Sequence, residues 1–364
     1  MNFFTVFTYM PYAFFALTMA TFVLPLRLKV RAQAIWTMAL LLCFSKFLCF
    51  NAFGGHPFNP DLPAAAIWTW DWLYSGAMIL SALGLFTVFF RFRAKRWLLP
   101  LIAWGLSAWG LYNGLRVPDV HEVELEYADL PASLDGYRIV QLADLHCSSA
   151  AQRGRTEAVV AKANALHADL ICLTGDSADG QVSRIARHLE PIRGLRAKDG
   201  VFACMGNHEY YHDYYAWMSQ FYSRVKNIRF LTNECAFPRA GLALAGVPDE
   251  AGWERGFDPV PDPCLAFAAA TNGEFRVLLQ HRPKGAVESI RELGVRLQLS
   301  GHAHGGIAPP FRPIIASLNG GFVRGLYPLG ESYLYVSPGS GQWGGFPMRL
   351  FNDSEISVLT LRRK

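Results

Sequence analysis

Two histidines, His302 and His304, stand one residue apart in the stretch SGHAHGGIAPP (residues 300–310), with glycines on both sides. Nothing about packing requires such a pair. In a strand, residues at i and i+2 point to the same side, and in a glycine-bent turn both rings can be directed at one small object. Imidazole is the commonest protein ligand for metal ions. The pair therefore raises the question whether other parts of the chain supply further ligands.

Other short apolar runs also end in polar side chains of the metal-binding kind. Ligands of open α/β folds gather at the carboxyl ends of strands, so these side chains are expected to meet. Two carboxylates, an amide and several imidazoles, with no cysteine at ligand spacing, suit two divalent ions that share a bridging carboxylate and a bridging water. The runs are YRIVQLAD (137–144), DLICLTGD (169–176), GVFACMGN (200–207) and FRVLLQH (275–281), and the polar side chains are Asp144, His146, Asp176, Asn207, His208, Glu209 and His281.

Each of these residues alone has an ordinary structural interpretation, as a buried histidine, a helix-capping aspartate or a turn asparagine. The ordered set of five strand ends is what favours a dimetal centre, because ligand type and position agree repeatedly. The remaining histidines have no ligand partners at suitable spacing and are expected on the surface or in packing: His56, His121, His167, His188 and His212.

The elements that must position the ligands alternate between strands and helices. Further strand-like runs are LALAGV (242–247), VRLQLSGH (295–302) and YLYVS (333–337), and the stretch GRTEAVVAKANALHA (154–168) is typical of an amphipathic helix. This alternation predicts an α/β layer architecture.

The motifs DLH, GDSAD, GNHE, QH and GHAH, in this order, resemble the calcineurin-like metallophosphoesterases, in particular membrane-anchored bacterial members. The resemblance covers about residues 121–362, including the closing stretch YVSPGSG…FPMRLFNDSEISVLTL. It implies a four-layer αββα sandwich with a dimetal site at one sheet edge. Three departures from the family pattern, Ala303, Ile307 and Cys147, remove no ligand and bear on substrate preference.

The resemblance also implies roles for single residues. His208 would face the substrate phosphate and stabilise its charge or protonate the leaving oxygen, with Glu209 orienting the His208 ring. Asp179 would be a residue of the turn or of the surroundings of the metals. The ions would be manganese, iron or zinc. One ion would be held by Asp144, His146, Asp176 and His304, and the other by Asp176, Asn207, His281 and His302, so that Asp176 bridges them.

The first third of the chain differs from the rest in charge and hydropathy. Up to Arg116 there are nine Lys/Arg and two acids, a charge of +7, and the remaining 25 basic and 27 acidic residues give −2. The overall charge of +5 is thus confined to the first third, and no nucleic-acid-binding face is expected elsewhere. We expect two domains, a transmembrane region at 1–117 and the metallophosphoesterase domain at 118–364.

Four apolar runs (3–26, 33–54, 64–90 and 97–115) predict a four-helix transmembrane region, since each has roughly the 18–20 residues needed to cross a bilayer. The basic residues lie at 27–31 and in the cluster RFRAKR (91–96), which predicts that these two links are cytoplasmic and both termini are outside. The seven scattered cysteines form no disulfide framework. Lys46 and Asp71 fall at similar depths in neighbouring spans and are expected to pair.

These observations predict a multi-pass protein of the bacterial inner membrane whose catalytic domain is extracytoplasmic. The expected activity is hydrolysis of a phosphate ester, on a lipid-borne substrate, by a hydroxide that bridges two metals. Three alternatives remain open: hydrolysis of soluble phosphoesters, cleavage of a nucleotide-sugar lipid pyrophosphate by a cytoplasmic domain, and a non-enzymatic membrane scaffold. Cys147, beside a ligand, is not needed as a nucleophile.

Overall fold

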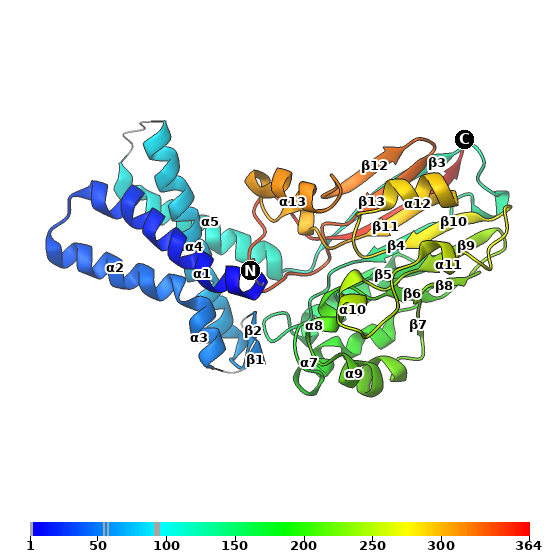
Figure 1. Cartoon of the computed structure of the whole chain (residues 1–364), viewed down its shortest axis with the longest axis horizontal. Helices are drawn as coiled ribbons and strands as arrows, with labels where there is room; N and C mark the ends of the chain where they lie inside the picture. The colour runs from blue at the N-terminus through cyan, green and yellow to red at the C-terminus, as the bar shows by residue number, and fades with distance from the viewer. Residues whose placement is uncertain (1–2, 54, 57, 91–94) are drawn as a thin grey trace. The chain divides into compact units, whose positions relative to one another are not determined.

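The computed structural model describes residues 3–53, 55–56, 58–90 and 95–364 of the 364-residue chain (Figure 1). The chain divides into two compact units. The helical unit comprises Met1–Gly114 together with Trp343–Leu350, and the α/β unit comprises Leu115–Gln342 together with Phe351–Lys364. Residues 343–350, called the returning segment below, were expected within the second domain and instead belong to the helical unit.

The helical unit is built from apolar helices. Two of them, with apolar stretches at Tyr9–Leu26 and Ala64–Phe89, are long and apolar enough to cross a membrane. Its elements are α1 (Phe3–Thr18), a π-helical turn (Met19–Val23), a 3-10 turn (Leu24–Leu26), α2 (Val30–Phe44), α3 (Lys46–Ala52), β1 (Gly55–His56), β2 (Asn59–Pro60), α4 (Ala64–Phe89), a 3-10 turn (Arg96–Leu98) and α5 (Leu99–Leu115).

The expected second span is bent. Helices α2 and α3 meet at 56°, so the described residues hold two possible spans, or three if this pair crosses as one. The break falls at Ser45, whose hydroxyl donates to the carbonyl of Leu42 at 2.7 Å. Helix α5 has 17 residues, at the lower limit of roughly 17–25 that a crossing needs, and it is not among the helices found long and apolar enough. The four spans predicted from sequence are therefore not confirmed, and residues 91–94 of the basic cluster lie outside the described part of the chain.

The expected contact between Lys46 and Asp71 is confirmed. The Lys46 ammonium lies 2.6 Å from the Asp71 carboxylate, and both residues are buried. The rings of Phe47, Phe50 and Tyr74 surround the ammonium with centroids at 5.0–5.4 Å. An ion pair inside an apolar helical unit is stable only when the charges are also hydrogen-bonded.

The returning segment supplies that further hydrogen bond. The Lys46 ammonium donates to the carbonyl of Gly344 at 2.9 Å. The Trp343 ring packs edge-on against Phe58 with centroids 5.1 Å apart, and the Arg349 amide donates to the carbonyl of Gly110 at 2.8 Å. A segment far along the chain thus completes the core of the helical unit.

The α/β unit contains two six-stranded sheets of mixed direction. The first has the order β3 (Asp119–Tyr127), β14 (Glu355–Arg363), β4 (Arg138–Leu142), β5 (Leu170–Thr174), β6 (Val201–Cys204) and β7 (Ile228–Phe230). The second has the order β12 (Gly325–Leu329), β13 (Ser332–Val336), β11 (Val295–Ser300), β10 (Phe275–Leu279), β9 (Leu242–Gly246) and β8 (Glu234–Ala236). Strands β4 to β7 run parallel, as do β9, β10, β11 and β13, so within each set the carboxyl ends meet at one edge.

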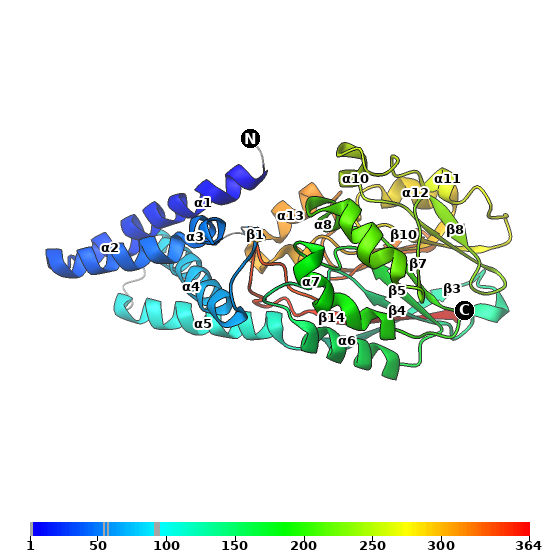
Figure 2. The ribbon, with the colours of Figure 1, turned by 90° about the horizontal axis from the view of Figure 1, so that it is seen from below.

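The two sheets pack face to face and helices cover their outer faces (Figure 2). Alternate side chains such as Ile139 and Leu244 form the core between the sheets, whereas Val140 packs on the helices. This is the expected sandwich of two sheets between helical layers. The helices are α6 (Arg153–Ala165), α7 (Val182–Leu189), α8 (His208–Tyr211), α9 (Tyr214–Ala216), α10 (Glu250–Glu254), α11 (Pro263–Ala266), α12 (Ala286–Leu293) and α13 (Arg312–Leu318).

Candidate metal centre

The loops after five parallel strands bring the expected ligands together. Asp144 and His146 follow β4, Asp176 follows β5, and Asn207 and His208 follow β6. His281 follows β10, and the opening pair His302 and His304 follows β11. All of them are buried except His302 and His304, which are partly exposed.

The first group of potential ligands is Asp144, His146 and His304. The Nε2 atoms of the two histidines lie 3.1 Å apart, and Asp144 Oδ1 lies 3.6 Å from His304 Nε2. Asp176 Oδ2 is 3.8 Å from His146 Nε2. Ligand atoms about 2.1 Å from one ion stand roughly 3–3.5 Å apart, so this spacing fits a shared cation.

The second group is Asp176, His281 and His302. Around His281 Nε2, the atoms Asp176 Oδ2, Asn207 Oδ1 and His302 Nδ1 each lie at 3.2 Å. Asp176 therefore stands next to both groups, as the bridging role requires.

In both groups of potential ligands, lone pairs face one another and need a positive charge between them. His146 Nδ1 is hydrogen-bonded to the Asp179 carboxylate and His281 Nδ1 to the carbonyl of Thr174, so in the neutral rings each Nε2 carries a bare lone pair. These lone pairs face carboxylate, amide and imidazole acceptors. Burial opposes a charge on His281, but Asp176 and Asp144 outweigh it and raise its pKa to about 10. A proton or a metal ion must supply the charge, and the residues present fit two divalent ions.

The backbone is strained where the ligands sit. Asp144, His146, Asp176, His302 and His304 all have φ between 44° and 68°. This left-handed region is unfavourable for non-glycine residues, by roughly 1–3 kcal/mol each, and such strain clusters at functional sites. All five strained residues are potential metal ligands.

Glycines in the motifs allow the loops to approach closely. A Cβ on Gly206 would lie against the Asp176 carboxylate and 2.5 Å from the Asp176 amide nitrogen. A Cβ on Gly301 would similarly meet the carboxylate of Asp144. The glycines of GNHE and SGHAH therefore leave space for the two carboxylates.

A third group of potential ligands, His146, Asp179 and His208, shares His146 with the first group, and in it His208 is held by Asp179. His208 Nδ1 is 2.6 Å from Asp179 Oδ1, and its Nε2 is 4.0 Å from Asp176 Oδ2. Burial opposes a charge on this ring, but Asp176 and Asp179 outweigh it and raise the His208 pKa to about 9. Asp179 also contacts His146 Nδ1 at 3.0 Å, so one carboxylate orients a potential ligand and the neighbouring histidine. The sequence left this role open, and the only hint was the second aspartate of GDSAD.

Glu209 has a different role from the one expected. We predicted that it orients the His208 ring, whereas the structure gives that position to Asp179. The Glu209 carboxylate accepts hydrogen bonds from the amides of Asp176 (3.0 Å), Ser177 (2.6 Å) and Gly206 (2.8 Å). It therefore holds the loops after β5 and β6 together, because each amide must find an acceptor when buried.

Cys147 and several histidines were expected to take no part in metal binding or catalysis, and their surroundings agree with this. Burial raises the pKa of Cys147 to about 11, and its sulfur lies 3.1 Å from the Thr156 hydroxyl, so it is a neutral thiol and a poor nucleophile. His188 Nδ1 accepts the amide proton of Arg153. Among the described side chains, none of His121, His167, His188 and His212 belongs to a group of potential metal ligands.

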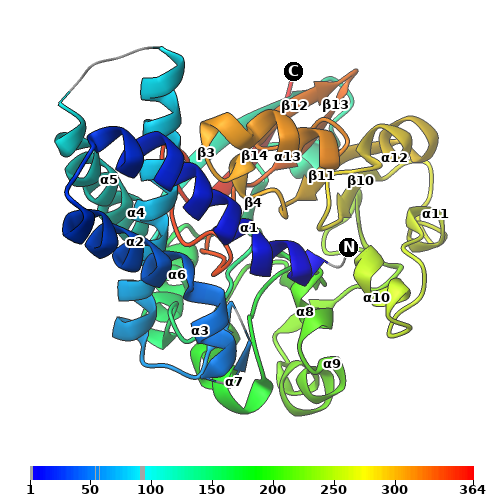
Figure 3. The same cartoon turned by 60° about the vertical axis from the view of Figure 1, so that its left-hand side comes forward.

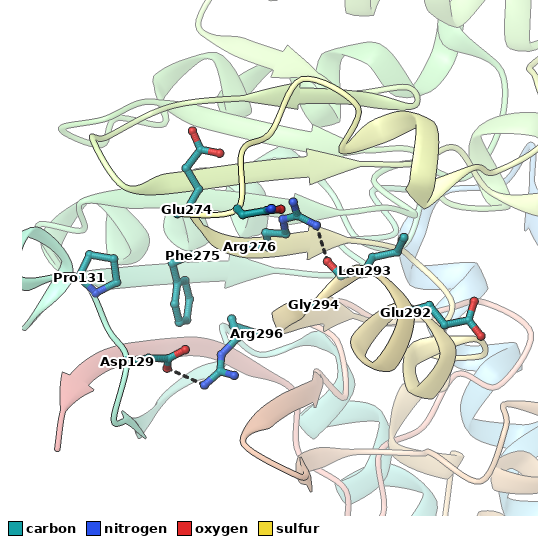
Figure 4. Close-up of a pocket in the computed structure, with 11 residues that line it drawn as sticks. Asp129, Pro131, Glu274, Phe275, Arg276, Glu292, Leu293, Gly294 and Arg296 are labelled. Atoms are coloured by element: carbon teal, nitrogen blue, oxygen red, sulfur yellow. Dashed lines mark hydrogen bonds and ion pairs between the residues drawn. The ribbon is translucent and has the colours of Figure 1, made fainter.

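A separate pocket of about 640 Å³ lies at the opposite, amino-terminal ends of β10 and β11 (Figure 4). Its arginines are already engaged: Arg296 pairs with Asp129 at 2.6 Å, and Arg276 donates to the carbonyl of Leu293 at 2.5 Å. None of the potential ligands lines it. The chemistry is therefore confined to the other edge of the sheets.

Comparisons with known proteins agree with this centre. A family model described as calcineurin-like phosphoesterase matches residues 137–306. The chain is 33% identical over 268 residues to a Danio rerio transmembrane protein with metallophosphoesterase domain, covering 71% of this chain and 60% of that protein. It is 33% identical over 254 residues to an uncharacterized metallophosphoesterase of Campylobacter jejuni, covering 69% and 65%. It is 30% identical over 273 residues to one of Bacillus subtilis, covering 72% and 93%.

The match thus spans less than two thirds of the length of the first two relatives, and nearly all of the third. The matched range 137–306 contains every residue of both ligand groups. The chain belongs to the calcineurin-like metallophosphoesterase family, whose members use a dinuclear metal centre to hydrolyse phosphoesters.

Proposed function

We propose that this protein is a membrane-anchored, dimetal-dependent phosphohydrolase that cleaves a phosphate ester on a lipid-linked substrate. The observation that carries the proposal is the convergence of two ligand groups on one shared carboxylate, Asp176, with His208 beside them. One ion would be held by Asp144, His146, Asp176 and His304, and the other by Asp176, Asn207, His281 and His302.

Two bound divalent ions would lower the pKa of water so that hydroxide is available near neutral pH, and would neutralise charge on the phosphoryl oxygens. The residues of the protein orient the reacting groups and stabilise the charge on the phosphoryl oxygens. With Nδ1 donating to Asp179, the protonated His208 ring presents Nε2–H on the side of Asp176, where it can stabilise the phosphoryl oxygens and protonate the leaving oxygen. Asp179 is a positioning residue, because it acts through His146 and His208.

The membrane part of the proposal is supported by the composition of the helical unit. We infer four spans in a bacterial inner membrane, with the α/β unit outside the cytoplasm, because the basic residues gather in two of the links between apolar runs. A relative named as a transmembrane protein with metallophosphoesterase domain supports the membrane location. A lipid-linked substrate follows from placing a phosphoesterase next to its bilayer. Soluble phosphoesters, a nucleotide-sugar lipid pyrophosphate and a non-enzymatic scaffold are the alternatives.

The test uses full-length protein, stripped with a chelator and then supplied with manganese. A phosphomonoester, a phosphodiester and a lipid phosphate are offered in parallel. We expect hydrolysis to disappear on chelation, to return with manganese and to favour the lipid phosphate. His281→Ala should abolish turnover, whereas His188→Ala, at another buried histidine outside both groups, should retain it. Hydrolysis that survives chelation, or equal losses in the two variants, would exclude a dimetal mechanism.

A further inference from the structure

An exposed apolar patch lies on the chain that follows the last potential ligand. On α13, Ile314 is 59% exposed and Leu318 71% exposed, and they lie on one side of the helix at i and i+4. Phe351 is 63% exposed. A neighbouring side of α13 is already covered, since Ile315 packs against a cluster that includes Leu334 and Val336 of β13. Figure 3 shows α13 beside β12 and β13. Ile314, Leu318 and Phe351 are called the apolar patch below.

Hydrogen bonds hold the patch together and place it at the rim of the centre. Arg312, at the start of α13, donates to the carbonyl of Phe351 at 3.0 Å. Asn352, the next residue, donates through its side-chain amide to the carbonyl of His304 at 2.5 Å. The patch is thus one or two hydrogen bonds away from a potential metal ligand.

On the α13 side of the patch the charge has one sign, and the Asp353 carboxylate, two residues beyond Phe351, lies 3.9 Å from the Arg116 guanidinium. Residues 305–330 contain two arginines, Arg312 and Arg324, and no acidic residue. Among the described residues neither arginine pairs with a carboxylate: Arg312 bonds the Phe351 carbonyl and Arg324 bonds Asn352 Oδ1. Large apolar side chains rimmed by unpaired cations are suited to an anionic lipid surface, where the apolar groups enter the acyl boundary and the cations meet phosphates.

The continuity of the chain also supports a lipid surface as the partner of the apolar patch. Phe351 follows Leu350 by one peptide bond, and Leu350 belongs to the helical unit, whose helices are apolar enough to cross a membrane. Consecutive Cα atoms are about 3.8 Å apart, so Phe351 is tied directly to the unit that we propose to lie in the membrane. Exposed apolar side chains at that position are therefore near lipid rather than far from it.

We propose that the apolar patch, with Arg312 and Arg324, docks on the anionic surface of the bilayer and so brings lipid phosphates to the rim of the metal centre. The kinetic part of this inference rests on the proposed function, whereas the docking itself does not. The surface therefore distinguishes lipid-borne from soluble phosphate esters without contacting the reacting atoms.

The kinetic test compares full-length wild type with the double variant Ile314→Ser/Leu318→Ser. The control is Leu265→Ser/Val287→Ser, which changes two similarly exposed side chains (57% and 45%) on α11 and α12. Substrates are a soluble phosphomonoester and phosphatidate in phosphatidylcholine vesicles with phosphatidylglycerol. We expect the patch variant to keep its kcat/KM on the soluble ester and to lose roughly tenfold or more on phosphatidate, since two large apolar contacts with lipid are lost. Equal losses on both substrates, or the same loss in the control, would overturn the proposal.

Hydrogen exchange gives a readout that does not depend on activity. In nanodiscs of phosphatidylcholine with phosphatidylglycerol, amides of residues 311–322 should exchange more slowly than in phosphatidylcholine alone, and Ile314→Ser/Leu318→Ser should remove the difference. Slower exchange in a protein that cleaves no ester would keep the docking and reject the proposed function. Exchange that is insensitive to lipid, or that slows only with protein concentration, would reject the docking and indicate a second copy of the chain on the patch.

Discussion

Asp176 and Asp179 are three residues apart and both are buried, yet they are expected to respond very differently to the same change. Asp176 stands in contact distance of both ligand groups, 3.2 Å from His281 Nε2 and 3.8 Å from His146 Nε2. Asp176→Asn removes the shared negative charge and should lower the metal content of the purified protein, together with nearly all turnover. The Asp179 carboxylate contacts the Nδ1 atoms of His146 and His208, which point away from the potential metal positions.

Asp179→Asn keeps the shape of the side chain and one acceptor oxygen. It removes the charge from two hydrogen bonds, and hydrogen bonds to charged groups contribute about 1.5–3 kcal/mol each. At about 1.4 kcal/mol per tenfold, weakening the bond to His208 predicts a fall in kcat of roughly 10- to 100-fold, while the direct metal ligands remain in place. Elemental analysis and steady-state kinetics on the same preparations separate the two variants. Similar metal loss in both would refute the assignment of Asp176 as the shared ligand and Asp179 as a positioning residue.

Two further predictions concern the helical unit. Lys46→Met and Asp71→Leu should each lower stability in detergent by about 3–5 kcal/mol, because each leaves a buried charge unpaired, and the double variant should recover most of the loss except about 1 kcal/mol for the unpaired Gly344 carbonyl. Thermal unfolding of the wild type, the two single variants and the double variant measures these losses of stability. Strictly additive losses would contradict the pairing. A phosphatase or fluorescent reporter fused after Lys364 should report an extracytoplasmic position. A cytoplasmic signal would reverse the orientation and favour the nucleotide-sugar alternative.

The convergence of the potential ligands was predictable because it depends on the order and the direction of the strands. Parallel strands bring their carboxyl ends to one edge, so the residues closing YRIVQLAD, DLICLTGD and GVFACMGN had to meet. The partners of Asp179 and Glu209 were not predictable, since they depend on left-handed turns at Asp144, His146 and Asp176 that no residue type announces. A change in one backbone φ angle decides whether a nearby carboxylate reaches a histidine ring, as that of Asp179 does, or backbone amides, as that of Glu209 does.

In the helical unit, too, some features were predictable from the sequence and others were not. Hydropathy located the apolar runs, and their lengths placed Lys46 and Asp71 at the same depth. The bend at Ser45 was not visible, because a serine is compatible with a straight helix and the break depends on local hydrogen bonds. The returning segment was also missed. Its glycine-rich sequence has no periodicity, and its place is set by contacts with Lys46, Phe58 and Gly110.

The returning segment has a consequence for how the chain is synthesised. Lys46 emerges from the ribosome 298 residues before Gly344, whose carbonyl completes its hydrogen bonding, so the helical unit stays unfinished while the α/β unit is made. The α/β unit stays unfinished as well, because β14 (Glu355–Arg363) lies between β3 and β4 in the first sheet. Both units are therefore completed by the same last stretch of chain. Residues 115–342 expressed alone would lack β14 from the first sheet, and the helices alone would leave the Lys46 ammonium with Asp71 but without the Gly344 carbonyl, so each unit made separately would lack part of its structure.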